Sequence, residues 1–161
     1  MNFFNIACQE APILADIFGL CDDRLGQPAY TKMDDPDSWV ATVQNRSGEA
    51  VVFTAIDKCV INDHEFPGRG RCDGMLTTDR ILYLVELKDQ EPPWQTGALE
   101  QLRSTIQFLI ENHDITRFSI KKVFACNKKR TRFVTFDNEE NQRFMRETSF
   151  RKDFQSTIVV L

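Results

Sequence analysis

The chain has 161 residues, of which 42% are hydrophobic and 27% charged, with a formal net charge of −4. These are ordinary globular values, and we expect residues 1–161 to form one domain with one sizeable core. The charge balance excludes a globally basic protein that binds nucleic acid without regard to sequence.

The N-terminal segment and the cysteines bear on where the protein works. The segment contains Glu10 and Asp16 and no basic leader, and no apolar run approaches the ~20 residues of a membrane span. We therefore expect a soluble, cytoplasmic protein with no membrane partner. The five cysteines contain no CxxC pair, which favours reduced, mostly buried thiols. A zinc site from Cys59, His64 and Cys72 is a weaker alternative, because the usual paired spacing is missing.

The first elements along the chain are predicted to be a helix and a strand hairpin. Apolar residues recur at helical spacing in 9–20, with Gly19 near the end of the run, which predicts a helix. Residues 26–38 are rich in turn formers and predict a loop. Two strand-like runs, 39–45 and 50–61, flank the sequence RSGE, which indicates a hairpin.

The later elements alternate between strands and helices. Residues 71–77 and 80–88 read as strands around Thr78-Asp79, and an apolar stripe predicts a helix from about Thr96 to His113. Beyond it we expect a strand over 118–127, a basic loop over 128–132, a helix over 137–150 and a terminal strand over 156–161. This order predicts an α/β or α+β domain with a mixed central β-sheet flanked by helices.

The run 80–88 ends in charged residues. Side chains alternate along a strand, so Leu84, Glu86 and Lys88 share one face, and both faces are apolar where the strand begins. We therefore expect a central strand covered on both sides, with Glu86 and Lys88 at its far end near a helix. Charge in such a place costs free energy unless it is paired or binds something.

The preceding strand contributes a second carboxylate. If the hairpin turn holds two residues, Asp73 pairs with Leu84 and becomes the diagonal neighbour of Glu86, at roughly 7–8 Å. An odd-length loop would place Asp73 on the opposite face. The two carboxylates and the main-chain carbonyl of Leu87 are hard oxygen ligands that suit Mg²⁺. Lys88 would stabilise charge that develops on a phosphate. The alternative is a structural Lys–Glu pair at an exposed strand end.

These residues resemble the PD-(D/E)xK phosphodiesterase superfamily, which has the restriction endonuclease-like fold. The resemblance lies in Asp73 of GRCDGML, in Glu86-Leu87-Lys88 of YLVELKD, and in the helix that follows. The family's core order, α-βββ-α-β, matches the predicted elements from about residue 8 to 127, to which a C-terminal helix and strand are added. The resemblance implies a nuclease in which Asp73 and Glu86 bind Mg²⁺ or Mn²⁺ and Lys88 is the catalytic lysine. The proline of the family's name is Cys72 here.

The resemblance also suggests two further site residues. Some members have a glutamine on the helix after the lysine strand, and Gln101 matches it; the alternative is a surface glutamine. Some have a glutamate on the first helix as an extra metal ligand, and Glu10 matches it. The alternative for Glu10 is a first-turn acid favoured by the helix dipole.

Basic residues gather late in the chain. Residues 1–65 contain 4 basic and 11 acidic side chains, whereas the last 47 residues contain 11 basic and 5 acidic. The candidate nucleic-acid contacts are Arg69, Arg71, Lys121, Lys128, Lys129, Arg130 and Arg132. A solvated loop is the alternative for the basic patch at 128–132.

The expected substrate is nucleic acid, with DNA favoured over RNA. The sequence shows no recognition domain, so a homodimer partner or another protein subunit would select the site, as in a phage-defence or DNA-processing system. A catalytically inactive binding or regulatory subunit is the main alternative, because the acidic N-terminal third could face another protein. A plain α/β domain with incidental charges is the third.

Overall fold

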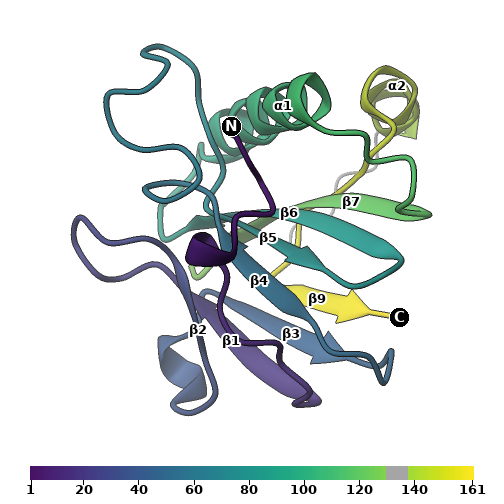
Figure 1. The fold of residues 1–161 in the computed structure, drawn as a ribbon. Coiled ribbons are helices and arrows are strands. Elements are labelled where there is room, and N and C mark those ends of the chain that lie inside the picture. The colour runs from purple at the N-terminus through teal and green to yellow at the C-terminus, as the bar shows by residue number, and fades with distance from the viewer. Residues whose placement is uncertain (130–137) are drawn as a thin grey trace.

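The computed structural model describes residues 1–129 and 138–161 and contains two β-sheets and two α-helices (Figure 1). The first sheet has the strand order β2 (Tyr30–Lys32), β1 (Ile17–Cys21), β3 (Ala41–Asn45) and β9 (Thr157–Val160). The second has the order β4 (Val52–Ala55), β5 (Gly74–Thr77), β6 (Ile81–Lys88), β7 (Ile120–Asn127) and β8 (Arg151–Asp153). The helices are α1 (Gln95–Asn112) and α2 (Asn138–Thr148), with short 3₁₀ turns at Ile6–Cys8 and Pro36–Ser38.

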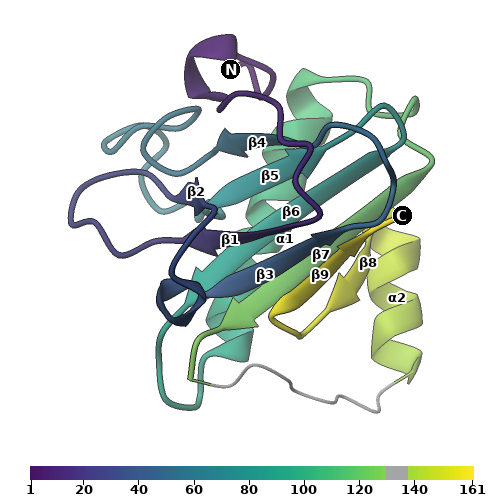
Figure 2. The ribbon, with the colours of Figure 1, turned by 90° about the horizontal axis from the view of Figure 1, so that it is seen from below.

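The elements form three layers (Figures 1 and 2). Both helices cover one face of the five-stranded sheet, where Leu84 packs with Leu102 and Phe144 in one hydrophobic core. The four-stranded sheet covers the other face, where Tyr83 and Val43 belong to a second core. The protein thus has a mixed α/β fold, as predicted, and β6 is buried on both faces as expected. The prediction that helices flank the central sheet is corrected, because they cover only one face and a second, unpredicted sheet covers the other.

The centre of the five-stranded sheet determines how the candidate site is built. β4, β5 and β6 form an antiparallel meander, and β7 lies parallel to β6 on its other side. Parallel neighbours need a crossover connection, and α1 provides it between β6 and β7. The predicted strands and helices of this region are confirmed, with α1 beginning and ending within one residue of its expected bounds.

The predicted helix over residues 9–20 is wrong. Gln9 and Ile13 form antiparallel bridges with Thr54 and Val51, so this segment runs extended along the edge of β4. β1 then begins at Ile17. Phe18 is buried in the core between the sheets, as are the three residues that follow it, and only Ile17, 53% exposed, faces solvent. Short apolar runs fit both periods, and here the sheet edge decided between them.

The predicted hairpin between 39–45 and 50–61 is also wrong. Both strands exist, but β3 pairs with β1 and β9 while β4 pairs with β5, so the RSGE turn joins two different sheets. The terminal strand β9 is confirmed, and it lies parallel to β3. The short strands β1, β2 and β8 were not predicted; β2 lies inside the segment expected to be a loop.

The cysteine prediction is corrected in part. Cys8 and Cys59 form a disulfide across 51 residues, because the N-terminal segment lies against the end of the β4 region. Cys21, Cys72 and Cys126 are buried free thiols, as expected. The bonded Cys59 has no thiolate to offer a zinc ion, which removes the alternative zinc site.

The search for membrane spans covered the described residues. Neither of their two α-helices combines the length and the apolar character that crossing a bilayer requires.

Candidate active site

The β5–β6 hairpin places Asp73 beside Glu86. Thr77 pairs with Leu82 and Gly74 pairs with Val85, so the connection is two residues longer than predicted but still even in length. Asp73 therefore stays on the face of Glu86, as expected. The register shifts by two residues, and the Asp73 amide donates to the Val85 carbonyl at 3.1 Å. Asp73 thus lies just outside the last regular ladder pair, Gly74 with Val85, and the predicted pairing of Asp73 with Leu84 is wrong.

The Asp73 carboxylate takes the place of a main-chain ladder partner. β5 begins at Gly74, and Asp73 Oδ2 accepts a hydrogen bond from the Leu87 amide at 2.6 Å. The amide and carbonyl of one strand residue point toward the same neighbouring strand. The Leu87 carbonyl therefore faces the side of β6 on which Asp73 lies, which is the position predicted for a main-chain ligand.

Glu86, Lys88 and Gln101 form a chain of contacts between β6 and α1. Lys88 Nζ lies 2.8 Å from Glu86 Oε1 and donates to Gln101 Oε1 at 2.6 Å. Gln101 Nε2 in turn donates to the Arg71 carbonyl at 3.3 Å. Gln101 therefore contacts the site through Lys88, as its predicted position on the following helix required. It holds the lysine ammonium at a fixed point beside the carboxylates.

Glu86 carries the most unusual atom of the site. The residue is 1% exposed, and within residues 1–129 and 138–161 its Oε2 has no hydrogen-bond partner. Burying a carboxylate oxygen without a partner costs desolvation free energy, and no hydrogen bond or ion pair to that oxygen offsets the cost. This oxygen, on the face shared with Asp73, is therefore available to a ligand that provides positive charge.

Burial also changes the protonation of both carboxyl groups. It raises the pKa of Asp73 to about 7, against the hydrogen bond from Leu87, which lowers the pKa. Burial and the neighbouring Asp73 raise the pKa of Glu86 well above its usual range, while Lys88 lowers it. Both shifts favour the protonated forms, and a divalent cation between the two groups would favour the charged forms.

Two further acids lie near Asp73, where the strands end, and were not predicted from the sequence as site residues. Asp22 directly follows β1 and Asp57 follows β4, and both raise the pKa of Asp73 through their charge. The Asp57 amide donates to the Cys72 carbonyl at 3.2 Å. β4 and β6 both run antiparallel to β5, so their carboxyl ends meet at one edge. The sequence predictions gave no signal for either acid, because Asp22 followed the predicted helix over 9–20 and Asp57 lay inside the predicted strand over 50–61.

Comparison with known protein families, curated proteins and solved structures gives no match to this chain. No family or activity is therefore transferred from another protein, and the function is inferred from the chemistry of the site's own residues. In the described part of the chain, no three acidic, histidine or cysteine side chains already form a metal-binding group.

Both arginines before Asp73 are paired with acids, Arg71 with two acids beside the site and Arg69 with Glu111 near the end of α1. Arg71 Nε lies 2.6 Å from Asp57 Oδ1, and its Nη2 lies 2.6 Å from Asp63 Oδ1. Arg69 stacks over the Phe108 ring at 3.5 Å. Both arginines, with Gln101, line a cavity of about 240 Å³. They are thus placed next to the partner of Lys88, as a phosphate contact there would require.

Lys128 and Lys129 lie at the same edge as the candidate site. The Lys128 amide donates to the Lys88 carbonyl at 2.8 Å, and both lysine side chains are exposed just beyond the end of β7. Lys129 Nζ is 3.9 Å from the exposed carboxylate of Glu91. These positions agree with contacts to a nucleic-acid backbone that reaches Lys88.

The other predicted nucleic-acid contacts are not found at this end of β6. Lys121 pairs with Leu82 near the opposite end of β6, and its ammonium donates to the Phe118 carbonyl at 3.0 Å. Arg130 and Arg132 lie outside the described residues.

Glu10 lies in the extended segment that replaces the predicted first helix. Its carboxylate accepts hydrogen bonds from the Thr31 amide, at 3.0 Å, and from the Thr31 hydroxyl. The two predicted roles of Glu10 were a metal ligand on the first helix and a contact with that helix's dipole. Both predictions are wrong, because the helix does not form. Glu10 instead links the N-terminal segment to β2.

Proposed function

We propose that the protein is a metal-dependent nuclease that hydrolyses phosphodiester bonds in nucleic acid, with DNA favoured over RNA. One observation carries the proposal: Asp73, Glu86 and Lys88 converge at the end of β6, where Glu86 Oε2 is buried without a partner in the described structure. Two carboxylates beside a fixed lysine match the chemistry of phosphodiester hydrolysis.

The order of elements around the site supports a restriction endonuclease-like core. The meander β4-β5-β6, the helix α1 and the parallel strand β7 follow the family's βββ-α-β order. The helix that opens the family's core has an extended segment in its place. The resemblance therefore extends from β4 to β7 and covers Asp73, Glu86, Lys88 and Gln101.

The donor atoms fit a Mg²⁺ or Mn²⁺ ion. Asp73, Glu86 and the Leu87 carbonyl offer hard oxygens, which these ions prefer. An ion there would give Glu86 Oε2 its missing partner and favour the charged form of both acids. When bound, it supplies Lewis-acid polarisation of the phosphate and a more acidic water.

The chain's own residues would orient and stabilise the reacting groups. Gln101 and Glu86 hold Lys88 between them, so its ammonium can orient the attacking water and stabilise negative charge on the phosphate oxygens. Burial of Glu86 keeps the local dielectric low, which strengthens each of these interactions. Lys128 and Lys129 would bind the flanking phosphates at the open edge.

Cleavage assays test the proposal directly. Wild-type protein incubated with supercoiled plasmid and with single-stranded DNA should cleave at least one of them in Mg²⁺ or Mn²⁺, and EDTA should stop the reaction. RNA of the same sequence tests the preference for DNA. Intact substrates in both metals, at any protein concentration tried, would contradict a nuclease.

We expect the Glu86→Gln variant to bind Mn²⁺ at least about tenfold more weakly than wild type, because it keeps the side-chain shape and removes a ligand charge. Isothermal titration calorimetry measures the affinity. Glu91→Gln, which changes a 70% exposed acid next to the site, is the matched control and should bind as wild type. Equal Mn²⁺ affinity in the Glu86→Gln variant would remove Glu86 from the metal site.

The closed geometry of the acids favours a second candidate, a nuclease-fold subunit that binds or regulates a larger complex. Glu86 is 1% exposed and already paired with Lys88, as a structural ion pair would be. This candidate predicts nucleic-acid or subunit binding with neither Mn²⁺ binding nor cleavage. Light scattering, with and without nucleic acid, would show whether a homodimer or a partner complex forms.

A further inference from the structure

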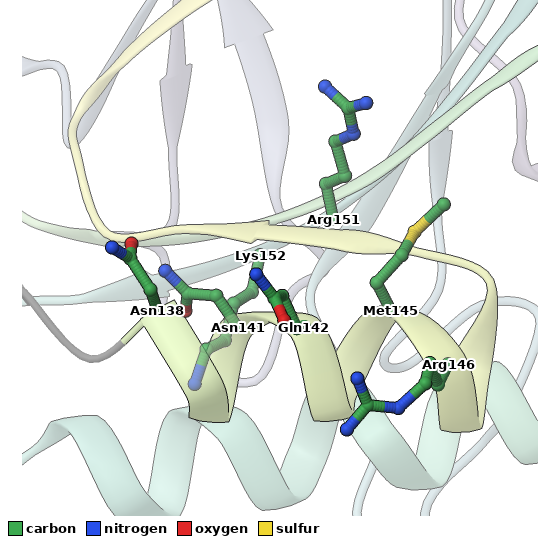
Figure 3. Close-up of a pocket in the computed structure, with 7 residues that line it drawn as sticks. All are labelled: Asn138, Asn141, Gln142, Met145, Arg146, Arg151 and Lys152. Atoms are coloured by element: carbon green, nitrogen blue, oxygen red, sulfur yellow. The ribbon is translucent and has the colours of Figure 1, made fainter.

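A groove far from the catalytic edge runs between α2 and the edge strand β8 (Figure 3). It has a volume of about 460 Å³ and is lined by Asn138, Asn141, Gln142, Met145 and Arg146 from α2 and by Arg151 and Lys152 from β8. A second cavity of about 380 Å³ shares Met145 and Arg151 with it and reaches Lys121 and Lys122 on β7. We call the two together the α2–β8 groove; each is the size of a small-ligand site.

The charged side chains that line the α2–β8 groove are basic. No aspartate or glutamate side chain lines either cavity in the portion of the chain that the structure describes. Arg146 and Arg151 are exposed and make no ion pair with any described residue. Lys152 differs, because Glu140 lies 3.1 Å from its ammonium. The groove therefore presents free guanidinium groups, which bind phosphate oxygens well.

The sheet register is a second observation that favours binding of an anion. Lys122 pairs directly with Arg151 in the parallel ladder between β7 and β8. Like charges opposite each other on neighbouring strands destabilise a sheet. The Lys122 ammonium lies 5.9 Å from the centre of the Tyr83 ring, which offsets part of this cost. An anion bound between Lys122 and Arg151 would remove the repulsion.

The groove also has polar groups that can recognise more than charge. Figure 3 shows Asn138, Asn141 and Gln142 on the side of α2 that faces β8. Their side-chain amides make no hydrogen bond to the described residues, so both donors and acceptors are available. Met145, 41% exposed, adds an apolar surface beside them. Amides next to an apolar side chain suit the edges and faces of unpaired bases.

We propose that the α2–β8 groove binds an unpaired strand of nucleic acid, with its phosphates on Lys122, Arg146 and Arg151 and its bases toward the amides of α2. The choice of nucleic acid over another polyanion rests on the proposed function. The groove lies beside the first half of β6, whereas the catalytic residues lie at the end of β6. It would therefore hold the substrate outside the reacting centre.

Salt-dependent binding of fluorescein-labelled oligothymidylate tests the groove, with fluorescence anisotropy measured in EDTA so that no cleavage occurs. Arg146→Glu and Arg151→Glu should each weaken binding and reduce the slope of log K against log salt by about 0.7, the value for one phosphate contact with a single strand. Arg46→Glu is the matched control, because it makes the same charge change just after β3, in the other sheet. An equal loss in the control, or unchanged slopes in both groove variants, would overturn the proposal.

Further arms separate this proposal from the nuclease itself. Arg146→Glu and Arg151→Glu should keep the wild-type affinity for Mn²⁺, so loss of groove binding is distinguishable from loss of the metal site. Tighter binding of duplex than of oligothymidylate would overturn the assignment to an unpaired strand. Equally effective competition by polyglutamate would show that an acidic peptide is the ligand, and would overturn it too. Circular dichroism checks that each variant is folded, and Arg151→Gln replaces Arg151→Glu if that variant is not.

Discussion

Replacing Lys88 with methionine should lower the rate of DNA cleavage at saturating metal by at least about 100-fold, the usual loss when one preorganised electrostatic group is removed from a transition state. Methionine keeps the length and packing of the stem but cannot donate to Gln101 or pair with Glu86. Single-turnover cleavage of a labelled substrate measures the chemical step without product release. Mn²⁺ affinity measured on the same variant should not fall, because Lys88 is not a ligand.

Two companion variants give the Lys88 result its meaning. Lys58→Met removes an ammonium that lies 3.7 Å from Asp57 at the same edge, so it controls for the change in local charge and should cleave near the wild-type rate. Lys88→Arg keeps the charge in a different shape and should recover only part of the activity. Wild-type cleavage by the Lys88→Met variant would contradict a catalytic role for the lysine. Equal losses of cleavage rate in the Lys58 and Lys88 variants would show that the rate depends on the total positive charge near the carboxylates and not on Lys88 itself.

Lys88 also has a role when no metal is bound. Its ammonium is 2.8 Å from Glu86 Oε1 and stabilises one of the two buried carboxylates. Asp73 has a weaker stabilising contact, the hydrogen bond that the Leu87 amide donates to its Oδ2. The folded protein thus supplies partial compensation for both acids and leaves Glu86 Oε2 without any among its described partners. This distribution of contacts would leave the metal-free site stable enough to fold and still able to bind a cation.

The sequence predicted the parts of this site that depend on local periodicity. The alternation along β6 identified the face of Glu86 and Lys88, and the even hairpin put Asp73 on that face. The helical stripe after β6 put Gln101 toward the strand ends, where it meets Lys88. Each of these signals lies within one element or one tight connection, so tertiary packing had little room to change it.

The parts that failed depend on contacts between distant segments. Whether residues 9–20 fold as a helix or a strand was decided by the edge of β4, some forty residues later. The approach of Asp22 and Asp57 to Asp73 requires strands from both sheets to end at one edge, and no spacing in the sequence encodes that. The Cys8–Cys59 disulfide follows from the same packing of the N-terminal segment. Such pairings are chosen by burial in the folded protein.

The metal-free protein should lose stability as pH rises from about 4 to 7, and the Asp73→Asn variant should lose less, with only the contribution of the buried Glu86 left. Folded Asp73 has a pKa of about 7, against 3.8 for an unperturbed aspartate. Between these values the unfolded chain has released the proton and the folded protein still binds it, so raising the pH favours unfolding. The two values set an upper limit of about 4 kcal/mol for the part of this loss that comes from Asp73, fully developed above pH 7.

Asparagine cannot ionise, and its side-chain oxygen can still accept the hydrogen bond from Leu87. In EDTA at pH 8 the Asp73→Asn variant should therefore be more stable than wild type, by up to the same limit, and the difference should shrink toward zero near pH 4. Urea unfolding at both pH values measures it. Asp79→Asn, in the exposed β5–β6 connection, is the control and should follow wild type at each pH. A difference between Asp73→Asn and wild type that does not change with pH would contradict the raised pKa.

Metal should reverse the order of the two proteins. At pH 8, Mg²⁺ binds the ionised carboxylates of folded wild type and stabilises it by an amount that grows with the logarithm of the Mg²⁺ concentration once the site is saturated. The Asp73→Asn variant lacks one ligand charge and should gain far less over the same range. Unfolding midpoints in rising Mg²⁺ therefore connect the cost of burying Asp73 to the ion that would offset it. Parallel gains in both proteins would mean that Mg²⁺ binds elsewhere, and that the burial of Asp73 serves the fold alone.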